Sequence, residues 1–279
     1  MNTRIIVDST ADLMPEFKNR VQVVPLTVRF GNEEYIDGVT IDHKTFYEKL
    51  IESDLLPTTS QATPDMFMKE LDKAKAAGDA AVVITLASPF SGTYQSATIA
   101  AAEYDNVYVV DSGTVAMGSG ILVELACRLL DEGKSAKEIA HILDEEKKKI
   151  VIVALVDTLE YLKKGGRVSK AVAFAGGVLN IKPVLSVIGG EIAMLGKARG
   201  SKMGNNLLVQ EIEKTGGIDF KKPVLLGYSG ISDALLLKYI EDSRHIWEGN
   251  LPEVRYTTVG SVIGTHAGPG AVAVAFFKN

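Results

Sequence analysis

The sequence predicts an α/β protein of two domains: an N-terminal domain with a mostly parallel sheet flanked by helices, and a C-terminal α/β domain. The first half of the chain alternates β-branched segments with helical patterns, as parallel sheets with crossover helices require. Residues 81–86 are almost wholly apolar, which is typical of a strand covered on both faces. A charge run at 144–149 precedes a second set of strands and helices, and this places the domain boundary near residue 150.

The predicted elements of the first domain, residues 1–150, follow these patterns in order. Segments rich in β-branched residues and bounded by turn signals are predicted strands, and amphipathic segments between them are predicted helices. Asp8, Thr85 and Asp111 then fall at carboxyl ends of strands, where α/β sheets bind ligands. The predicted strands are 4–7, 21–30, 80–86 and 107–110, and the predicted helices are 44–53, 64–77, 93–104, 113–132 and 135–149.

In the second domain, residues 151–279, strand and helix patterns again alternate, in shorter segments. Its sequence contains no internal repeat. A stretch rich in glycine and alanine predicts a helix around residues 170–179. The final apolar run predicts a buried strand. The other elements are expected at 150–155, 159–164, 183–188, 191–194, 203–214, 223–228, 234–246, 255–259 and 271–277.

Composition and charge exclude several classes of protein. Of the 279 residues, 46% are hydrophobic and 23% are charged, which is the range of globular proteins. The formal net charge of −5 argues against nucleic acid as a partner. The longest apolar stretches, 150–156 and 171–181, are far shorter than the ~20 residues that cross a bilayer. With no signal-peptide pattern and a single cysteine, Cys127, we expect a cytoplasmic protein without a membrane span.

Common cofactor and catalytic motifs are missing. Glu191 and Ala198 stand where a phosphate loop containing Gly196 and Lys197 would need its first glycine and its hydroxyl. Val123 stands where a dinucleotide fingerprint would need its third glycine. No Gly-x-Ser-x-Gly elbow occurs, and the four histidines are scattered without metal-ligand spacing. We therefore expect neither a cofactor nor a bound metal.

Two hydroxyl-rich turns are the first candidate binding elements. Residues 57–61 read Pro-Thr-Thr-Ser-Gln, and the helix cap predicted at Thr63 does not explain their hydroxyls. Residues 91–94 read Ser-Gly-Thr-Tyr directly after an apolar strand, with Ser91 as the predicted N-cap. Backbone N–H groups at such a helix start favour an anion by about 0.3–1 kcal/mol. The alternative is that residues 57–61 form an ordinary polar loop and that Ser91 only caps a helix.

A glycine-rich turn and a basic turn complete the candidates. His266 lies in Gly-Thr-His-Ala-Gly-Pro-Gly, where glycines allow close backbone approach and the imidazole could donate to a carboxylate or act as a general base. Lys163, Lys164 and Arg167 flank a Gly-Gly pair. This turn is either a helix C-terminus with Gly165 at C′, which the residues favour, or a basic docking patch.

Taken together, these segments resemble the DegV family, the fatty-acid-binding proteins that include the binding subunit of bacterial fatty acid kinase. The resemblance covers essentially the whole chain, in order. The matching segments are 7–13, which read Val-Asp-Ser-Thr-Ala-Asp-Leu, then 57–61, 91–97, 110–112, 159–169 and 264–270.

The resemblance implies a DegV-like two-domain protein that binds one long-chain fatty acid, such as palmitate, in an apolar tunnel. Residues 171–181 could line that tunnel or belong to a packed core. The acid would be presented to a separate ATP-dependent fatty acid kinase, with Arg167 and Arg199 facing this partner or the phosphoryl group. The chain would be a carrier without catalytic activity. The residues that the resemblance places at the carboxylate are Thr59, Ser60, Ser91, Gly92, Thr93 and His266.

Two other functions remain open from the residues alone. Ser91 and His266 could form the nucleophile and base of a serine hydrolase of acyl esters, with Asp8 or Asp111 orienting the histidine. The basic turn at 163–167 could instead bind a small phosphorylated metabolite.

Overall fold

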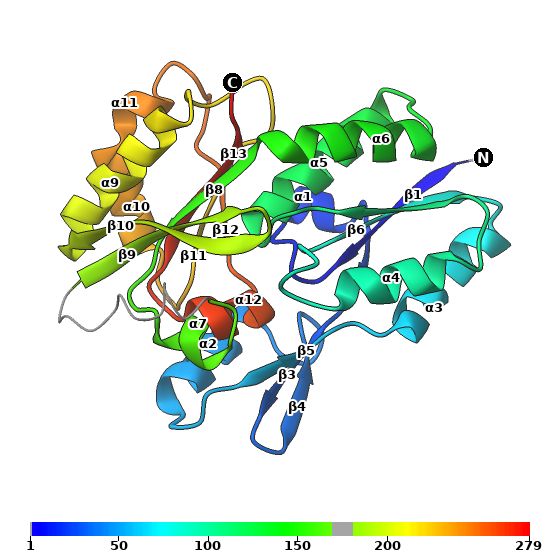
Figure 1. Cartoon of the computed structure of the whole chain (residues 1–279), viewed down its shortest axis with the longest axis horizontal. Coiled ribbons are helices and arrows are strands. Elements are labelled where there is room, and N and C mark those ends of the chain that lie inside the picture. The colour runs from blue at the N-terminus through cyan, green and yellow to red at the C-terminus, as the bar shows by residue number, and fades with distance from the viewer. Residues whose placement is uncertain (1, 169–180) are drawn as a thin grey trace.

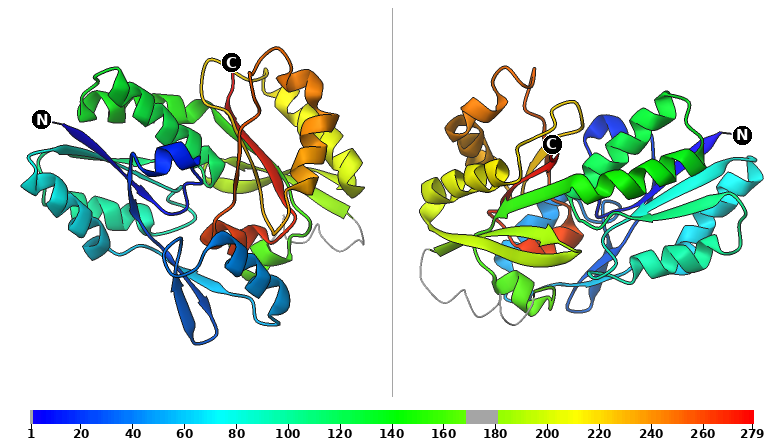
Figure 2. Two further views of the ribbon diagram at one scale, coloured as in Figure 1. Left: turned by 180° about the vertical axis from the view of Figure 1, so that it is seen from behind. Right: turned by 45° about the horizontal axis from the view of Figure 1, so that its top comes forward.

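The computed structural model describes residues 2–168 and 181–279. Within these residues the strands form three sheets, whose orders are β2-β1-β6-β7, β10-β9-β8-β13-β11-β12 and β4-β3-β5 (Figure 1). The four-stranded and the six-stranded sheet lie side by side, and the small sheet projects from one side of the molecule (Figures 1 and 2). The predicted α/β class is confirmed.

The first sheet is parallel throughout. It is built from β1 (Thr3–Asp8), β2 (Gln22–Val24), β6 (Ala80–Thr85) and β7 (Val107–Asp111). All of β6 is buried because helices cover both faces of the sheet. One face packs against α3 (Pro64–Ala76) and α4 (Thr93–Ala101), and the other against α5 (Met117–Asp131) and α6 (Ala136–Glu146).

The predicted strand at 21–30 is wrong as a single element. It divides into β2 and β3 (Thr27–Phe30), which lie in different sheets. Pro25 separates them, because proline has no N–H to donate to a strand ladder. β3 pairs with β4 (Glu33–Ile36) and β5 (Thr58–Ser60), neither of which the sequence predicted. The short helices α1 (Pro15–Lys18) and η1 (Lys147–Lys149) also depart from the predicted pattern, while α2 (His43–Glu52) follows it.

The second sheet is mostly antiparallel, and only its β11–β12 pair is parallel. Its outer face carries the helices α9 (Gly200–Lys214), α10 (Ala234–Asp242) and α11 (Arg244–Trp247), which form one apolar cluster with it. The inner face turns toward the start of α5. The strands are β8 (Ile150–Leu155), β9 (Ile181–Ile188), β10 (Glu191–Arg199), β11 (Leu225–Tyr228), β12 (Tyr256–Thr258) and β13 (Val272–Phe277).

The glycine-rich turn predicted around His266 is wrong, because Ser261–Ala267 forms a helix, α12. Its packing explains this. A side chain at Gly264 would collide with Phe46 and Tyr47, so glycine allows α12 to lie directly on α2. Gly268 ends the helix with a φ of +70°, a conformation that glycine adopts without strain. Both views show α12 beside α2 and α7 (Glu160–Lys164) (Figures 1 and 2).

The proposed division of the chain at residue 150 stays a prediction. β8 begins there, and α12 from the second half packs against α2 and β3 of the first half. The helix predicted around 170–179 lies outside the described residues, as does nearly all of the stretch 171–181. No helix in the described ranges combines the length and the apolar composition that crossing a bilayer requires.

Candidate binding site

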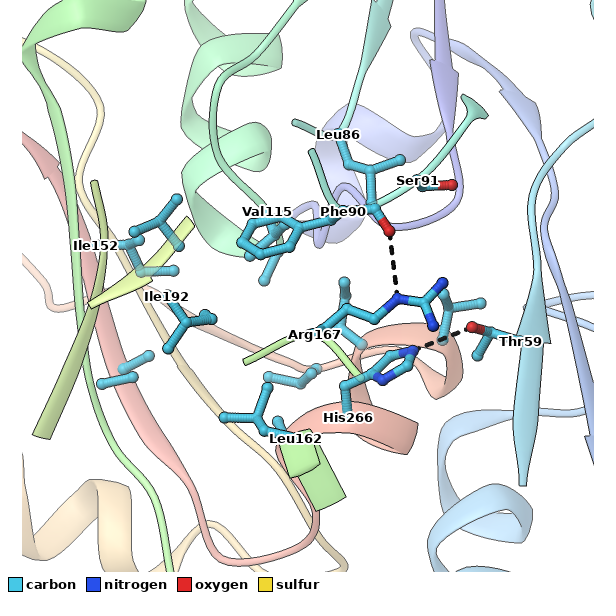
Figure 3. Close-up of a pocket in the computed structure, with 18 of the residues that line it drawn as sticks. Thr59, Leu86, Phe90, Ser91, Val115, Ile152, Leu162, Arg167, Ile192 and His266 are labelled. Carbon is cyan, nitrogen blue, oxygen red and sulfur yellow. Dashed lines mark hydrogen bonds between the residues drawn. The ribbon is translucent and has the colours of Figure 1, made fainter. Parts of the chain in front are cut away.

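A cavity of about 420 Å³ lies between the two large sheets, with α12 along one side (Figure 3). This volume is within the range of small-molecule sites. One end of the cavity is polar and the rest is mostly apolar. The polar end is lined by Thr59, Ser60, Gln61, Ser91, Gly92, Arg167 and His266. The rest contains Ser186 on β9 and apolar residues that include Leu86, Phe90, Val115, Met117, Ile152, Leu162, Leu185, Ile192 and Ile263.

The apolar part exists because the inner face of the second sheet carries small side chains. Ala154 on β8 and Ala273 on β13 are paired neighbours and both line the cavity. Larger residues, among them Ile152 and Ile192, form its walls (Figure 3). Since protein interiors are otherwise close-packed, the alanines leave a space that longer side chains would fill.

At the polar end, His266 meets Thr59. The Nε2 atom of His266, on α12, lies 3.0 Å from Oγ1 of Thr59, on β5 (Figure 3). Burial, assisted by the nearby charge of Arg167, lowers the pKa of His266 to about 4. The imidazole is therefore neutral at physiological pH, with one ring nitrogen protonated and the other free.

Gly165 makes room for this histidine. The Nδ1 atom of His266 is buried and has no hydrogen-bond partner in the described part of the chain. It faces Gly165, where any side chain would collide with it. The first glycine of the Gly-Gly pair thus has a packing role that the sequence did not reveal. Gly165 is the C-cap of α7, and Gly166, the next residue, adopts the positive φ of +68°. The pair thus ends a helix as predicted, but Gly166 and not Gly165 occupies the C′ position.

Ser91 directly precedes the N-cap of α4, although the sequence predicts it as the N-cap itself. Gly92 is the N-cap of α4, and the Ser91 hydroxyl accepts from the Thr93 N–H at 3.3 Å. Its Oγ also lies 2.9 Å from Thr93 Oγ1. Thr93 is fully buried and does not line the cavity, so it orients Ser91 instead of facing a ligand. Ser91 and Gly92 both line the cavity.

Gln61 is a site residue that sequence reasoning missed. Its side chain lines the cavity and donates to Ser96 on α4 at 3.0 Å. A side chain at Gly92 would collide with it. The available signal was its place at the end of the hydroxyl-rich turn, directly after Ser60. Thr63 is the N-cap of α3 as predicted, but its side chain makes no capping hydrogen bond.

Arg167 and Arg199 occupy different places. Arg167 is exposed at the polar end of the cavity, where its Nε donates to Phe90 O at 3.3 Å and its NH1 to Gly165 O at 2.7 Å (Figure 3). No carboxylate within the described ranges forms an ion pair with it. Arg199 is the exposed last residue of β10 and does not line the cavity, and neither do Lys163 and Lys164. Of these four basic residues, only Arg167 lines the cavity.

The hydrolase arrangement is not assembled. Ser91 is paired with Thr93 and His266 with Thr59, so no serine–histidine hydrogen bond forms. Asp8 accepts from Thr10 and Leu86, and Asp111 accepts from Ser88 and Gly113, so neither orients His266. Among residues 2–168 and 181–279, no three histidine, cysteine, aspartate or glutamate side chains gather as metal ligands.

Comparison with known proteins agrees with this architecture. The family model described as "Uncharacterised protein, DegV family" matches residues 2–279. A DegV domain-containing protein of Caldanaerobacter subterraneus subsp. tengcongensis is 35% identical over 278 residues, covering 98% of this chain and 97% of that protein.

Two solved structures are also similar over 100% of both chains. A DegV family protein from Thermus thermophilus, described as binding fatty acid, has a TM-score of 0.89 and 30% identity. DegV from Bacillus subtilis, described as a fatty acid binding protein, has a TM-score of 0.83 and 30% identity. With its whole length matched by the family model, and with relatives of this similarity, the chain belongs to the DegV family.

Proposed function

We propose that this protein binds one long-chain fatty acid, with the carboxylate at the polar end of the cavity and the alkyl chain in the apolar part. The observation that carries the proposal is the cavity's division into one polar end and a mostly apolar remainder. A fatty acid has the same division. Two similar solved structures are described as fatty-acid binding, which supports the assignment.

The polar end offers donors to a carboxylate. A buried carboxylate is costly unless its oxygens receive hydrogen bonds. Ser91 and Thr59 supply hydroxyls, and Arg167 supplies a positive charge that forms no ion pair with the described residues. If the neutral His266 carries its proton on Nε2, it donates to Thr59, whose own hydroxyl hydrogen is then free for the ligand. Ser60 and the backbone of Gly92 complete this head-group set, while Thr93 acts through Ser91.

The apolar part supplies most of the affinity. Each buried methylene contributes about 0.8 kcal/mol, so a long chain contributes roughly 10 kcal/mol before costs. The loss of translational freedom and the ordering of the chain offset much of this. The tail therefore determines how tightly an acid binds, and the head-group residues determine which end enters the polar site.

The protein is, in this proposal, a carrier that presents the acid to a separate ATP-dependent kinase. Arg167 lies beside the expected carboxylate position and is exposed, so it could meet a phosphoryl group as the acyl phosphate forms. Arg199, on the surface of the same half, would contact the kinase itself. The missing phosphate loop is consistent with ATP binding by the partner.

The decisive experiment is native mass spectrometry of the purified protein, followed by lipid analysis of an organic extract. We expect a one-to-one adduct that is identified as a long-chain fatty acid. Ser91→Ala and His266→Ala should retain the fold and hold the acid less tightly. A wild-type protein that is empty and takes up no added palmitate would refute the proposed function.

A further inference from the structure

The helix that carries His266 has no capping side chain of its own. Its N-cap is Gly260, and the first N–H groups of a helix need acceptors from elsewhere. Two aspartates from the first half of the chain supply them. The Gly260 N–H donates to Asp12 Oδ1 at 2.9 Å. The N–H and the hydroxyl of Ser261 donate to Asp37 Oδ1 at 3.2 and 2.5 Å.

Both aspartates are themselves fixed. Asp12 follows β1, and its N–H donates to the carbonyl of Ala116 at the start of α5. Asp37 follows β4, and its N–H donates to the carbonyl of Leu26. Asp12 is 5% exposed and Asp37 is 6% exposed, so these hydrogen bonds lie away from water. Hydrogen bonds to a buried carboxylate are among the strongest in proteins.

The two ends of α12 are mechanically linked. A helix rises about 1.5 Å per residue, so seven residues span about 10 Å. Its N-terminus is held by the aspartates, and its last turn carries His266 into the cavity. In its middle, α12 packs closely on α2 where Gly264 faces Phe46 and Tyr47. A tilt at the N-terminus would therefore move His266 relative to Thr59.

We propose that Asp12 and Asp37 are positioning residues for the head-group site: they hold the N-terminus of α12 and thereby keep His266 at hydrogen-bond distance from Thr59. This inference rests on the fatty-acid binding proposed above. It gives a function to Asp12 of the segment 7–13, which does not itself line the cavity.

The negative charges of Asp12 and Asp37 also couple their protonation to binding of the fatty-acid carboxylate. Burial raises the pKa of Asp37 and raises that of Asp12 well above its usual range, and the Asp37 carboxylate raises the latter further. Asp8 on β1 has a pKa raised by burial and by Asp37, while Lys18 at the end of α1 acts to lower the pKa values of Asp12 and Asp37.

From α2, Tyr47 and His43 face the same region, and burial favours their neutral forms. Additional negative charge near α12 is therefore costly. A fatty-acid carboxylate about 10 Å away, at the far end of α12, adds such a charge. Binding should then favour protonation of the aspartate pair, so the affinity for the acid should fall as pH rises above the usual carboxyl range.

A double-mutant cycle tests whether Asp37 acts through His266. Palmitate affinity is measured for the wild type, Asp37→Ala, His266→Ala and the double variant. We expect Asp37→Ala to weaken binding about tenfold in the wild type and less than about twofold in the His266→Ala background. Equal losses in both backgrounds would overturn the proposal. Asp131→Ala, which breaks an exposed pair with Arg20, is the control and should change neither affinity.

Asparagine variants supply a second readout that loss of stability alone would not produce. Asp37→Asn keeps an acceptor oxygen for Ser261 but removes the ionisable group. We expect it to bind palmitate within about twofold of the wild type near neutral pH, with a flatter dependence of affinity on pH. The same holds for Asp12→Asn. If both variants keep the wild-type pH dependence, the proposal is wrong.

Fatty-acid binding and the positioning role of Asp12 and Asp37 are refuted by different results. If the wild type takes up no palmitate, the proposed function fails. If it binds palmitate and Ser91→Ala weakens binding, but the cycle is additive, only the positioning role fails. Should Asp37→Ala not fold, histidine-selective NMR of Asp12→Ala, which removes the acceptor of the Gly260 N–H, decides the matter. A His266 side-chain signal unchanged from the wild type would overturn the proposal.

Discussion

The two parts of the cavity are built in different ways. The apolar part is formed by regular elements, with Ala154 and Ala273 on paired strands of the second sheet and Met117 at the start of α5. The polar end is assembled from short elements far apart in the chain, with Thr59 on β5 and His266 on α12. The apolar part therefore depends on side-chain size, and the polar end depends on tertiary contacts that hold short segments in place.

Filling the apolar part should have the largest effect on binding. Ala154→Phe places a ring in the cavity, and we expect palmitate affinity to fall at least about 100-fold because tail burial supplies most of the affinity. Ala193→Phe on β10 is the matched control, since Ala193 is also partly exposed but does not line the cavity. Titration calorimetry measures both. Equal losses in the two variants would contradict the assignment of the tail site.

The polar end should make stability depend on pH. The pKa of His266 is about 4 in the folded protein and near 6.5 in the unfolded chain, so the folded state disfavours its protonation. The stability contributed by the neutral imidazole is complete above pH 6.5 and is lost as pH falls toward 4. Between these pH values the wild type should lose about 3 kcal/mol more unfolding free energy than His266→Gln. Denaturant unfolding at both pH values tests this, and parallel losses would contradict the buried neutral histidine.

Removing one head-group hydroxyl should have an intermediate effect. Thr59→Val keeps the shape of the side chain but removes the hydrogen bond to His266 and the proposed one to the carboxylate. We expect palmitate affinity to fall about tenfold, the loss typical of a hydrogen bond to a charged group. Thr58→Val changes the neighbouring residue, which is exposed and does not line the cavity, and should bind as the wild type does.

The charge at the polar end should contribute least to binding. Arg167 is exposed, and exposed ion pairs contribute up to about 1 kcal/mol, so Arg167→Gln should weaken palmitate binding by no more than about fivefold. Added salt should reduce the difference from the wild type. Lys164→Gln, an exposed change outside the cavity lining, is the control. A 100-fold loss in Arg167→Gln would show that the charge, and not the alkyl chain, dominates affinity.

Regular elements with a strong local pattern were predictable from the sequence. The buried strand 80–86 and the helix 64–77 appear as β6 and α3 within a few residues. Asp8, Thr85 and Asp111 end their strands as expected. Of the residues proposed for the head group, Thr59, Ser60, Ser91, Gly92 and His266 line the cavity, although their contact with a fatty acid stays a prediction.

Short elements could not be predicted, because their own sequences do not determine them. β5 has three residues and forms only by pairing with β3. α12 contains a glycine and has no capping side chain of its own, so isolated helix propensity would disfavour it. Gln61 lines the cavity because it directly follows β5, which lies at the polar end. Arg199 does not line it, because β10 extends to residue 199 and places this arginine at its exposed end.

The sequence by itself therefore determined the α/β class, the parallel sheet and the hydroxyl and imidazole groups available for binding. These features depend on hydrophobic periodicity and residue chemistry, which can be recognised from residues close together in the chain. Only the tertiary structure decided that His266 lies on a helix, that its partner is Thr59 and that buried aspartates cap that helix. Asp12 and Gly260 are separated by 248 positions, and Thr59 and His266 by 207. Contacts over such separations arise from packing of the whole chain, which no local pattern encodes.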